Sequence, residues 1–131
     1  MRLQPQPLIA VGDVRASSRW YQHLLGCRAL PEHEHRNLYE RLFSDGEIVL
    51  QLHAWGEHDH PNLAAPGSTS SGNGVLLWFH LDDFDGAVSR ARELAAEVLE
   101  QPHTNPNSGN REIWLRDPDG YVVVLSAGPT C

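Results

Sequence analysis

Aromatic, imidazole and carboxylate side chains alternate with aliphatic ones in two short apolar segments. Trp78 and His80 stand two positions apart in one segment, and Glu112 and Trp114 stand two positions apart in the other. Indole rings offer flat, polarisable surfaces to a ring or a cation. Imidazole and carboxylate groups orient polar groups or transfer protons. These residue types predict a pocket for a small aromatic or cationic molecule.

A third segment, Leu50-Gln51-Leu52-His53, has the same alternation. Because successive side chains of a strand point to opposite faces, Gln51 and His53 share the face opposite to the two leucines. Two-residue pairing through the turn Asp45-Gly46 sets Glu40 opposite Gln51, a placement that a bulge would reverse. These segments supply the candidate ligand-binding residues, which are Gln51, His53, Trp78, His80, Glu112 and Trp114, with Glu40 as a further candidate.

The same set permits a metal site, because His53, His80 and Glu112 make two imidazoles and a carboxylate that suit Fe, Mn or Zn. The other histidines are expected on a helix surface or in solvated loops, where they stand among Glu, Asp and Asn. They are His23 on the helix and His33, His35, His58, His60 and His103 in loops. Cys27 and Cys131 form no CxxC pattern and are expected to be unpaired thiols.

Length and charge narrow the function classes. The chain has 131 residues, enough for one domain, and a formal net charge of −7. A groove that follows phosphates is normally basic, so nucleic acid is not an expected partner. No apolar stretch has the length of a membrane helix, and Met1–Pro7 has no apolar signal core, so we expect a cytoplasmic protein without membrane contact.

The elements that must position these residues occur twice. Leu8–Val11 reads as a strand, and the helix after it, capped by Asp13, ends near Gly26. About 70 residues later, Val75–Leu81 is followed by a helix expected from about Asp85 to Glu97. Each helix leads to a weak strand and then to a hairpin. The weak strands are Arg28–Pro31 and Val98–Gln101, and the hairpin strands are Leu38–Phe43, Glu47–Trp55, Glu112–Arg116 and Tyr121–Ser126.

Each half therefore predicts a β-α-β-β-β module, at about residues 5–57 and 74–127, with a Gly-, Ser- and Pro-rich linker at about 58–73. One such module cannot bury its sheet face alone. The predicted fold is a single α+β domain, 1–131, in which two βαβββ modules form a curved, mostly antiparallel sheet with helices outside. The concave face of that sheet is the expected pocket.

Two motifs resemble those of the vicinal oxygen chelate superfamily, which includes glyoxalase I, extradiol dioxygenases, fosfomycin-resistance enzymes and bleomycin-resistance proteins. The first runs from Val11-Gly12-Asp13-Val14 to Trp20-Tyr21-Gln22-His23-Leu24-Leu25-Gly26, similar to a family helix ending in FYxxxLG. The second is Ile113-Trp114-Leu115-Arg116-Asp117-Pro118-Asp119-Gly120, similar to the family's DPDG hairpin. The resemblance extends from about Pro7 to Ser126.

The resemblance implies four inward positions that hold a divalent metal in the family's enzymes. In this chain they fall on Gln6, Gln51, Leu76 and Val124. If Gln51 and Leu76 point inward, strand alternation places His53, Trp78 and His80 on the same concave face. The resemblance at the DPDG hairpin places Trp114, and by alternation Glu112, on that face as well. Neutral amides are poor ligands for a transition metal, and Leu and Val offer no lone pair. The expected cofactor is therefore none, with a divalent metal at His53, His80 and Glu112 as the alternative.

The type nearest to these departures is the bleomycin-resistance protein. We therefore expect a small-molecule binding protein that sequesters an antibiotic or metabolite without a metal. The alternative is a lyase, isomerase or dioxygenase of the same superfamily with a displaced metal site, and a weaker one is a metabolite sensor. The resemblance also implies a homodimer.

Overall fold

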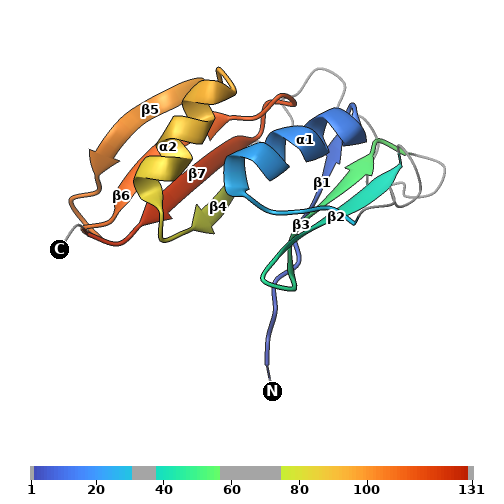
Figure 1. Cartoon of the computed structure of the whole chain (residues 1–131), viewed down its shortest axis with the longest axis horizontal. Helices are drawn as coiled ribbons and strands as arrows, with labels where there is room; N and C mark the ends of the chain where they lie inside the picture. Colours follow the sequence, from blue (N-terminus) through green and yellow to red (C-terminus); the bar gives the residue numbers. More distant parts are fainter. Residues whose placement is uncertain (1, 31–37, 57–74, 130–131) are drawn as a thin grey trace. The chain divides into compact units, whose positions relative to one another are not determined.

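The computed structural model describes residues 2–30, 38–56 and 75–129 (Figure 1). The chain divides into two compact units, Met1–Gly67 and Ser68–Cys131, and each is described by itself. The predicted linker lies outside the described residues, as do His33, His35, His58 and His60. In the described part of the chain, neither helix is long and apolar enough to cross a membrane.

The first unit contains β1 (Leu8–Val11), α1 (Val14–Leu25), β2 (Tyr39–Ser44) and β3 (Glu47–Ala54). Its sheet has the order β1-β3-β2, with β1 parallel and β2 antiparallel to β3. The β2–β3 turn, Asp45-Gly46, has positive φ at both residues, 51° and 79°. This is the backbone that a two-residue hairpin requires.

Helix α1 confirms both predicted ends. The Asp13 carboxylate accepts a hydrogen bond from the backbone N–H of Ala16 at 3.0 Å. Gly26 has φ of 68°, and its N–H donates to the carbonyl of Gln22 at 2.9 Å. Between these caps one face of the helix is buried, and its largest buried side chains are Tyr21 and Leu24.

The second unit contains β4 (Leu76–His80), α2 (Phe84–Glu93), β5 (Glu97–Thr104), β6 (Arg111–Arg116) and β7 (Val122–Ala127). Its sheet has the order β4-β7-β6-β5. β4 runs parallel to β7, and the other neighbouring pairs are antiparallel. Helix α2 lies across one face of this sheet (Figure 1).

The second helix is shorter than predicted. It begins after Asp83, whose carboxylate accepts from the N–H of Gly86 at 3.0 Å, and it ends at Glu93 instead of near Glu97. Leu94 caps it, and Ala95 takes the left-handed region with φ of 52°. The chain thus turns early into β5, and Ala95 is exposed.

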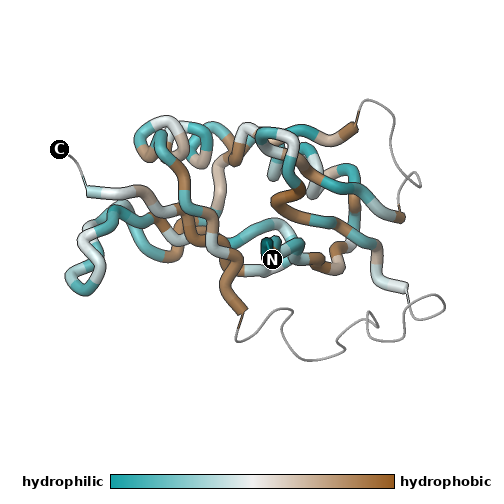
Figure 2. The backbone as a smooth tube through the Cα atoms, turned by 90° about the horizontal axis from the view of Figure 1, so that it is seen from below, coloured by the Kyte–Doolittle hydropathy of each residue, from teal (hydrophilic) through white to brown (hydrophobic). Residues whose placement is uncertain are grey.

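The two faces of the second sheet differ in burial because side chains alternate along each strand. Leu77, Ile113, Leu115, Val123 and Leu125 are buried on the face covered by α2. In Figure 2 the helices are mostly teal to white, and the brown segments fall largely on the strands. The apolar content of the sequence is therefore concentrated in the sheets, and each helix contributes one apolar stripe.

The α+β class and the two modules are confirmed, with differences in detail. Hydrogen bonding places the strands in two mixed sheets, one in each module. The strand expected at Arg28–Pro31 is reduced, in the described residues, to one bridge between Arg28 and Phe43. Its counterpart in the second module is longer than expected, because β5 extends to Thr104.

Candidate ligand-binding face

The candidate site is the face of the second sheet opposite to α2, which we call the open face. The strand register aligns its side chains in two rows across the four strands. We call Trp78, Val124, Trp114 and Glu100 the indole row. We call His80, Ser126, Glu112 and His103 the polar row. Four of the six predicted residues thus lie on one face, and Glu100, Ser126 and His103 join them.

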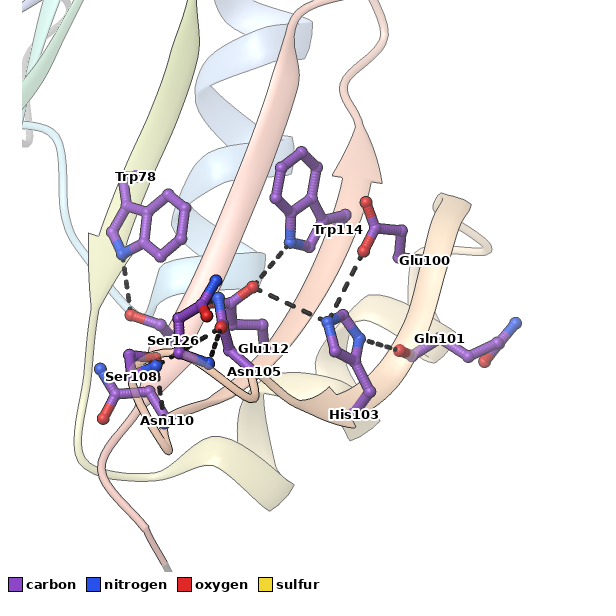
Figure 3. A network of polar contacts seen from close by, with 11 residues as sticks. Trp78, Glu100, Gln101, His103, Asn105, Ser108, Asn110, Glu112, Trp114 and Ser126 are labelled. Carbon is purple, nitrogen blue, oxygen red and sulfur yellow. Dashed lines mark hydrogen bonds and ion pairs between the residues drawn. The ribbon is translucent and has the colours of Figure 1, made fainter.

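The two indole rings form an edge-to-face pair (Figure 3). The ring centroids of Trp78 and Trp114 are 6.2 Å apart, with an interplanar angle of 80°. Trp78 Nε1 donates to Ser126 Oγ at 2.9 Å, and Trp114 Nε1 donates to Glu112 Oε1 at 3.0 Å. Trp78 is 45% exposed. Both N–H groups are therefore engaged by the protein, and the ring surface is what Trp78 offers to solvent.

Glu112 is a buried carboxylate, only 2% exposed. Its Oε1 accepts from Trp114, and its Oε2 accepts from Asn105 Nδ2 at 2.9 Å (Figure 3). Asn105 is held in turn, because its Oδ1 accepts from the N–H of Asn107 at 2.8 Å. Burying a carboxylate is costly unless donors replace water. Here the loop after β5 and the indole N–H supply those donors.

Ser126 links Trp78 to His80. Its side chain is 0% exposed, and its Oγ lies 2.8 Å from His80 Nδ1 while it accepts from the indole of Trp78. A serine hydroxyl has one proton and two lone pairs, so it can accept from Trp78 and donate to His80 at the same time. In that arrangement a neutral His80 carries its proton on Nε2.

Two register shifts in β5, one between Val98 and Glu100 and one between Glu100 and His103, bring Glu100 and His103 onto the open face. Glu100 pairs with Trp114 and His103 with Glu112, so three residue steps on β5 face two on β6. The extra residue compensates for the odd spacing, which in a regular strand would place the two side chains on opposite faces. His103 is exposed, as predicted, but it lies in strand β5 and not in a loop. Glu100 was missed, although Pro102, two residues further on, is of the type that strands accept at bulges and sheet edges.

In the first unit, the equivalent face has no indoles on its strands. Gln51 Oε1 accepts from the Tyr39 hydroxyl, and Gln51 Nε2 donates to the backbone carbonyl of Gln6 at 2.9 Å. His53 Nδ1 lies 2.6 Å from the carbonyl of Ala54, and its ring is 6.0 Å from that of Tyr39. Gln51 and His53 share the predicted face, and Tyr39, which was not predicted, lies with them.

Glu40 is not on that face. The register of β2 and β3 shifts between Leu42 and Phe43, and Glu40 pairs with Leu52 instead of Gln51. Directly opposite residues share a face, so Glu40 lies with Leu52 on the buried side and is 1% exposed. The bulge that would reverse the predicted placement is present.

The four positions that the resemblance assigns to metal ligands do not fit a divalent metal. Both ends of the Gln51 amide are engaged within the first unit. Leu76 and Val124 present only hydrocarbon on the open face. Of the alternative set, His80 and Glu112 lie in one row with Ser126 between them, and His53 belongs to the other sheet. Across the described residues, no group of three or more His, Cys, Asp and Glu side chains is arranged to hold a metal ion.

Cys27 follows the Gly26 cap of α1 and is buried as a free thiol. Burial raises the pKa of the Cys27 thiol from 9.0 to about 11, because the thiolate loses its hydration. A thiol of this kind is a structural group and not a nucleophile at neutral pH. Cys131 lies outside the described residues.

The duplicated module and its motifs define a class of proteins, and a family model identifies it. The model of the Glyoxalase/Bleomycin resistance protein/Dioxygenase superfamily matches residues 4–125. The chain belongs to that superfamily. No curated protein matches the chain.

Solved structures share the fold at low sequence identity. TioX from Micromonospora sp. ML1 is 19% identical over 96% of this chain and 98% of that chain, with a TM-score of 0.74. A glyoxalase/bleomycin resistance protein/dioxygenase family enzyme from Burkholderia phytofirmans PsJN is 21% identical over 93% and 95%, with a TM-score of 0.74. Lactoylglutathione lyase from Agrobacterium tumefaciens is 20% identical over 98% and 95%, with a TM-score of 0.68. These likenesses show the fold alone.

Proposed function

We propose that this protein binds a small aromatic or cationic molecule, an antibiotic or a metabolite, and sequesters it without a metal. The ligand lies on the open face of the second sheet, against the indole row. Binding alone is the function, so the protein needs no activated nucleophile and no cofactor.

The observation that carries the proposal is the pair of anchored indoles. An edge-to-face pair held by two N–H bonds has little rotational freedom left to lose when a ligand arrives. An aromatic ring of about 45% exposure also leaves a large polarisable surface in water. Such a surface gains from contact with a flat ring or a cation.

The polar groups around the indoles support a binding function over a catalytic one. The Ser126 hydroxyl is fully buried and is engaged by Trp78 and His80. Both oxygens of Glu112 accept hydrogen bonds from neighbouring side chains. Groups that hold one another in place orient the surface, whereas a catalytic base needs access to a substrate proton.

The test is calorimetric titration with acridine, a flat aromatic probe, of the wild type, Trp78→Ala and Trp55→Ala. Trp78 is half exposed, so its loss leaves the fold largely intact, and Trp55 in the first unit is the matched control. We expect acridine to bind the wild type and Trp55→Ala equally, and Trp78→Ala about tenfold more weakly. Equal binding of acridine by Trp78→Ala and the wild type would contradict the proposal, and so would the absence of binding of both acridine and its cationic derivative 9-aminoacridine to the wild type.

A further inference from the structure

Glu100 is the last residue of the indole row and lies on the edge strand β5. It stands directly opposite Trp114 in the register of β5 and β6, so one strand spacing, about 4.8 Å, separates the two backbones. Its side chain is 47% exposed. A ligand ring resting on Trp114 therefore has a carboxylate within reach of a substituent two or three bonds long.

The carboxylate of Glu112 lies near the same end of the indole row as Glu100, because both face His103. His103 Nε2 lies 3.6 Å from Glu100 Oε1 and 3.8 Å from Glu112 Oε1 (Figure 3). His103 Nδ1 lies 2.8 Å from the carbonyl of Gln101, which can only accept, so Nδ1 carries a proton. Even with Nε2 protonated as well, one imidazolium balances one of the two carboxylates. The end of the indole row keeps negative charge in either state of His103.

The remaining charges of the open face do not cancel it. Arg116, one row further along, donates from Nε to Glu97 Oε2 at 2.9 Å and from Nη1 to the carbonyl of Gly120 at 2.9 Å. Its charge is thus paired locally. The second unit as a whole has four arginines against nine Asp and Glu residues. A cation is favoured at this surface over a neutral molecule or an anion.

The indole groups also favour a cation over an anion. Their N–H groups already donate to Ser126 and Glu112, so they do not serve a ligand that brings acceptors such as carboxylate or nitro oxygens. What remains is the ring surface, which carries a negative quadrupole and attracts positive charge.

We propose that the ligand of this face is an aromatic cation, and that Glu100 is the residue that selects its charge. The ring stacks on one of the two indoles and meets the other edge-on, because the indole planes stand at 80° to each other, and the positive charge of the ligand faces Glu100. This inference rests on the proposed function and names the ligand class of that same site.

The experiment compares three probes with one ring system: 9-aminoacridine as the cation, acridine as the neutral molecule and acridine-9-carboxylate as the anion. Each is titrated by calorimetry at pH 7.5 into the wild type, Glu100→Gln and Glu93→Gln. Glu93 is an exposed residue of α2 in the same unit, so its variant has the same net charge as Glu100→Gln without a change at the row.

We expect the wild type to bind the cation tighter than the neutral probe and the anion weakest. The Glu100→Gln variant binds the cation about three- to tenfold more weakly and binds acridine with unchanged affinity. The Glu93→Gln variant changes neither affinity by more than about twofold. Acridine binding without a cation preference, or an equal loss in both variants, overturns the charge selection and leaves the proposed function standing. Absence of binding of all three probes to the wild type overturns both.

Discussion

The two sheets carry different side chains at equivalent positions of their open faces. Aligning the strand registers of the two modules pairs the residues one by one. In the first row Leu8, Gln51 and Arg41 correspond to Trp78, Val124 and Trp114. In the second row Ala10, His53 and Tyr39 correspond to His80, Ser126 and Glu112.

The difference lies in what holds each face together. In the first unit the central residue, Gln51, joins β2 to the segment before β1 through its amide. In the second unit the central residue, Val124, makes no polar contact of its side chain, and the hydrogen bonds instead anchor the flanking indoles to the next row. The helix-side residues stay aliphatic in both, with Leu50 and Leu52 in one and Val123 and Leu125 in the other. The repeat thus conserves its core face and varies its open face.

The largest effect is expected from Glu112→Leu. This change removes the acceptor of Trp114 Nε1 and Asn105 Nδ2 and leaves two part-buried donors without that partner. We expect the free energy of unfolding to fall by about 3 kcal/mol, measured by urea denaturation. Tyr39→Phe, at the equivalent position of the first unit, removes one neutral hydrogen bond to Gln51 and is expected to cost about 1 kcal/mol.

Glu112→Gln is the control for this pair, because an amide oxygen still accepts from Trp114. We expect the free energy of unfolding of Glu112→Gln to stay close to that of the wild type, unlike that of Glu112→Leu. A cost for Tyr39→Phe equal to that of Glu112→Leu would mean that the polar contacts of the two faces are equally important, against the comparison.

An exchange of the central residues sharpens the comparison further. Val124→Gln places an amide in a fully buried position of the indole row, and we expect a loss of about 2 kcal/mol in the free energy of unfolding. Gln51→Val removes two hydrogen bonds at a partly exposed position, for a loss of about 1 kcal/mol. Thermal and urea unfolding of both variants measure this. Equal costs would indicate that the amide fits either face.

The smallest effects are expected at the ends of the two helices. Gly26 and Ala95 both have left-handed backbone, with φ of 68° and 52°. Gly26→Ala should cost about 1 kcal/mol, because a Cβ is strained there although no atom lies within 4 Å of it. Ala95→Gly relieves that strain but raises the conformational entropy of the unfolded chain. We therefore expect the free energy of unfolding to rise by only about 0.5 kcal/mol. A loss of stability in Ala95→Gly would show that the two ends are not comparable.

The sequence was sufficient to predict the caps of α1 and the order of the helices and strands, apart from the strand expected at Arg28–Pro31. Leu8–Val11, Asp13 and Gly26 are where local rules place them, because capping and strand alternation depend on neighbouring residues. Alternation also paired Trp78 with His80 and Glu112 with Trp114, and the family resemblance placed both pairs on one face.

Register across strands could not be predicted in the same way. Glu40 moved to the buried face because of a shift at Leu42 and Phe43, and Glu100 and His103 came together through a bulge in β5. A bulge depends on how a strand fits its partner, and the strand's own residues need not signal it. The end of α2 at Glu93 likewise depends on where β5 must begin, whereas Ala95 and Ala96 have good helix propensity.

The irregular course of β5 has a consequence for solubility. As the outer strand of its sheet it exposes unpaired backbone groups, which invite a strand from another molecule to add and start aggregation. Its register shifts and Pro102 interrupt that template, since proline has no N–H to donate and a bulge bends the strand away from a flat partner. The distortion that aligns Glu100 with Trp114 therefore also protects the edge.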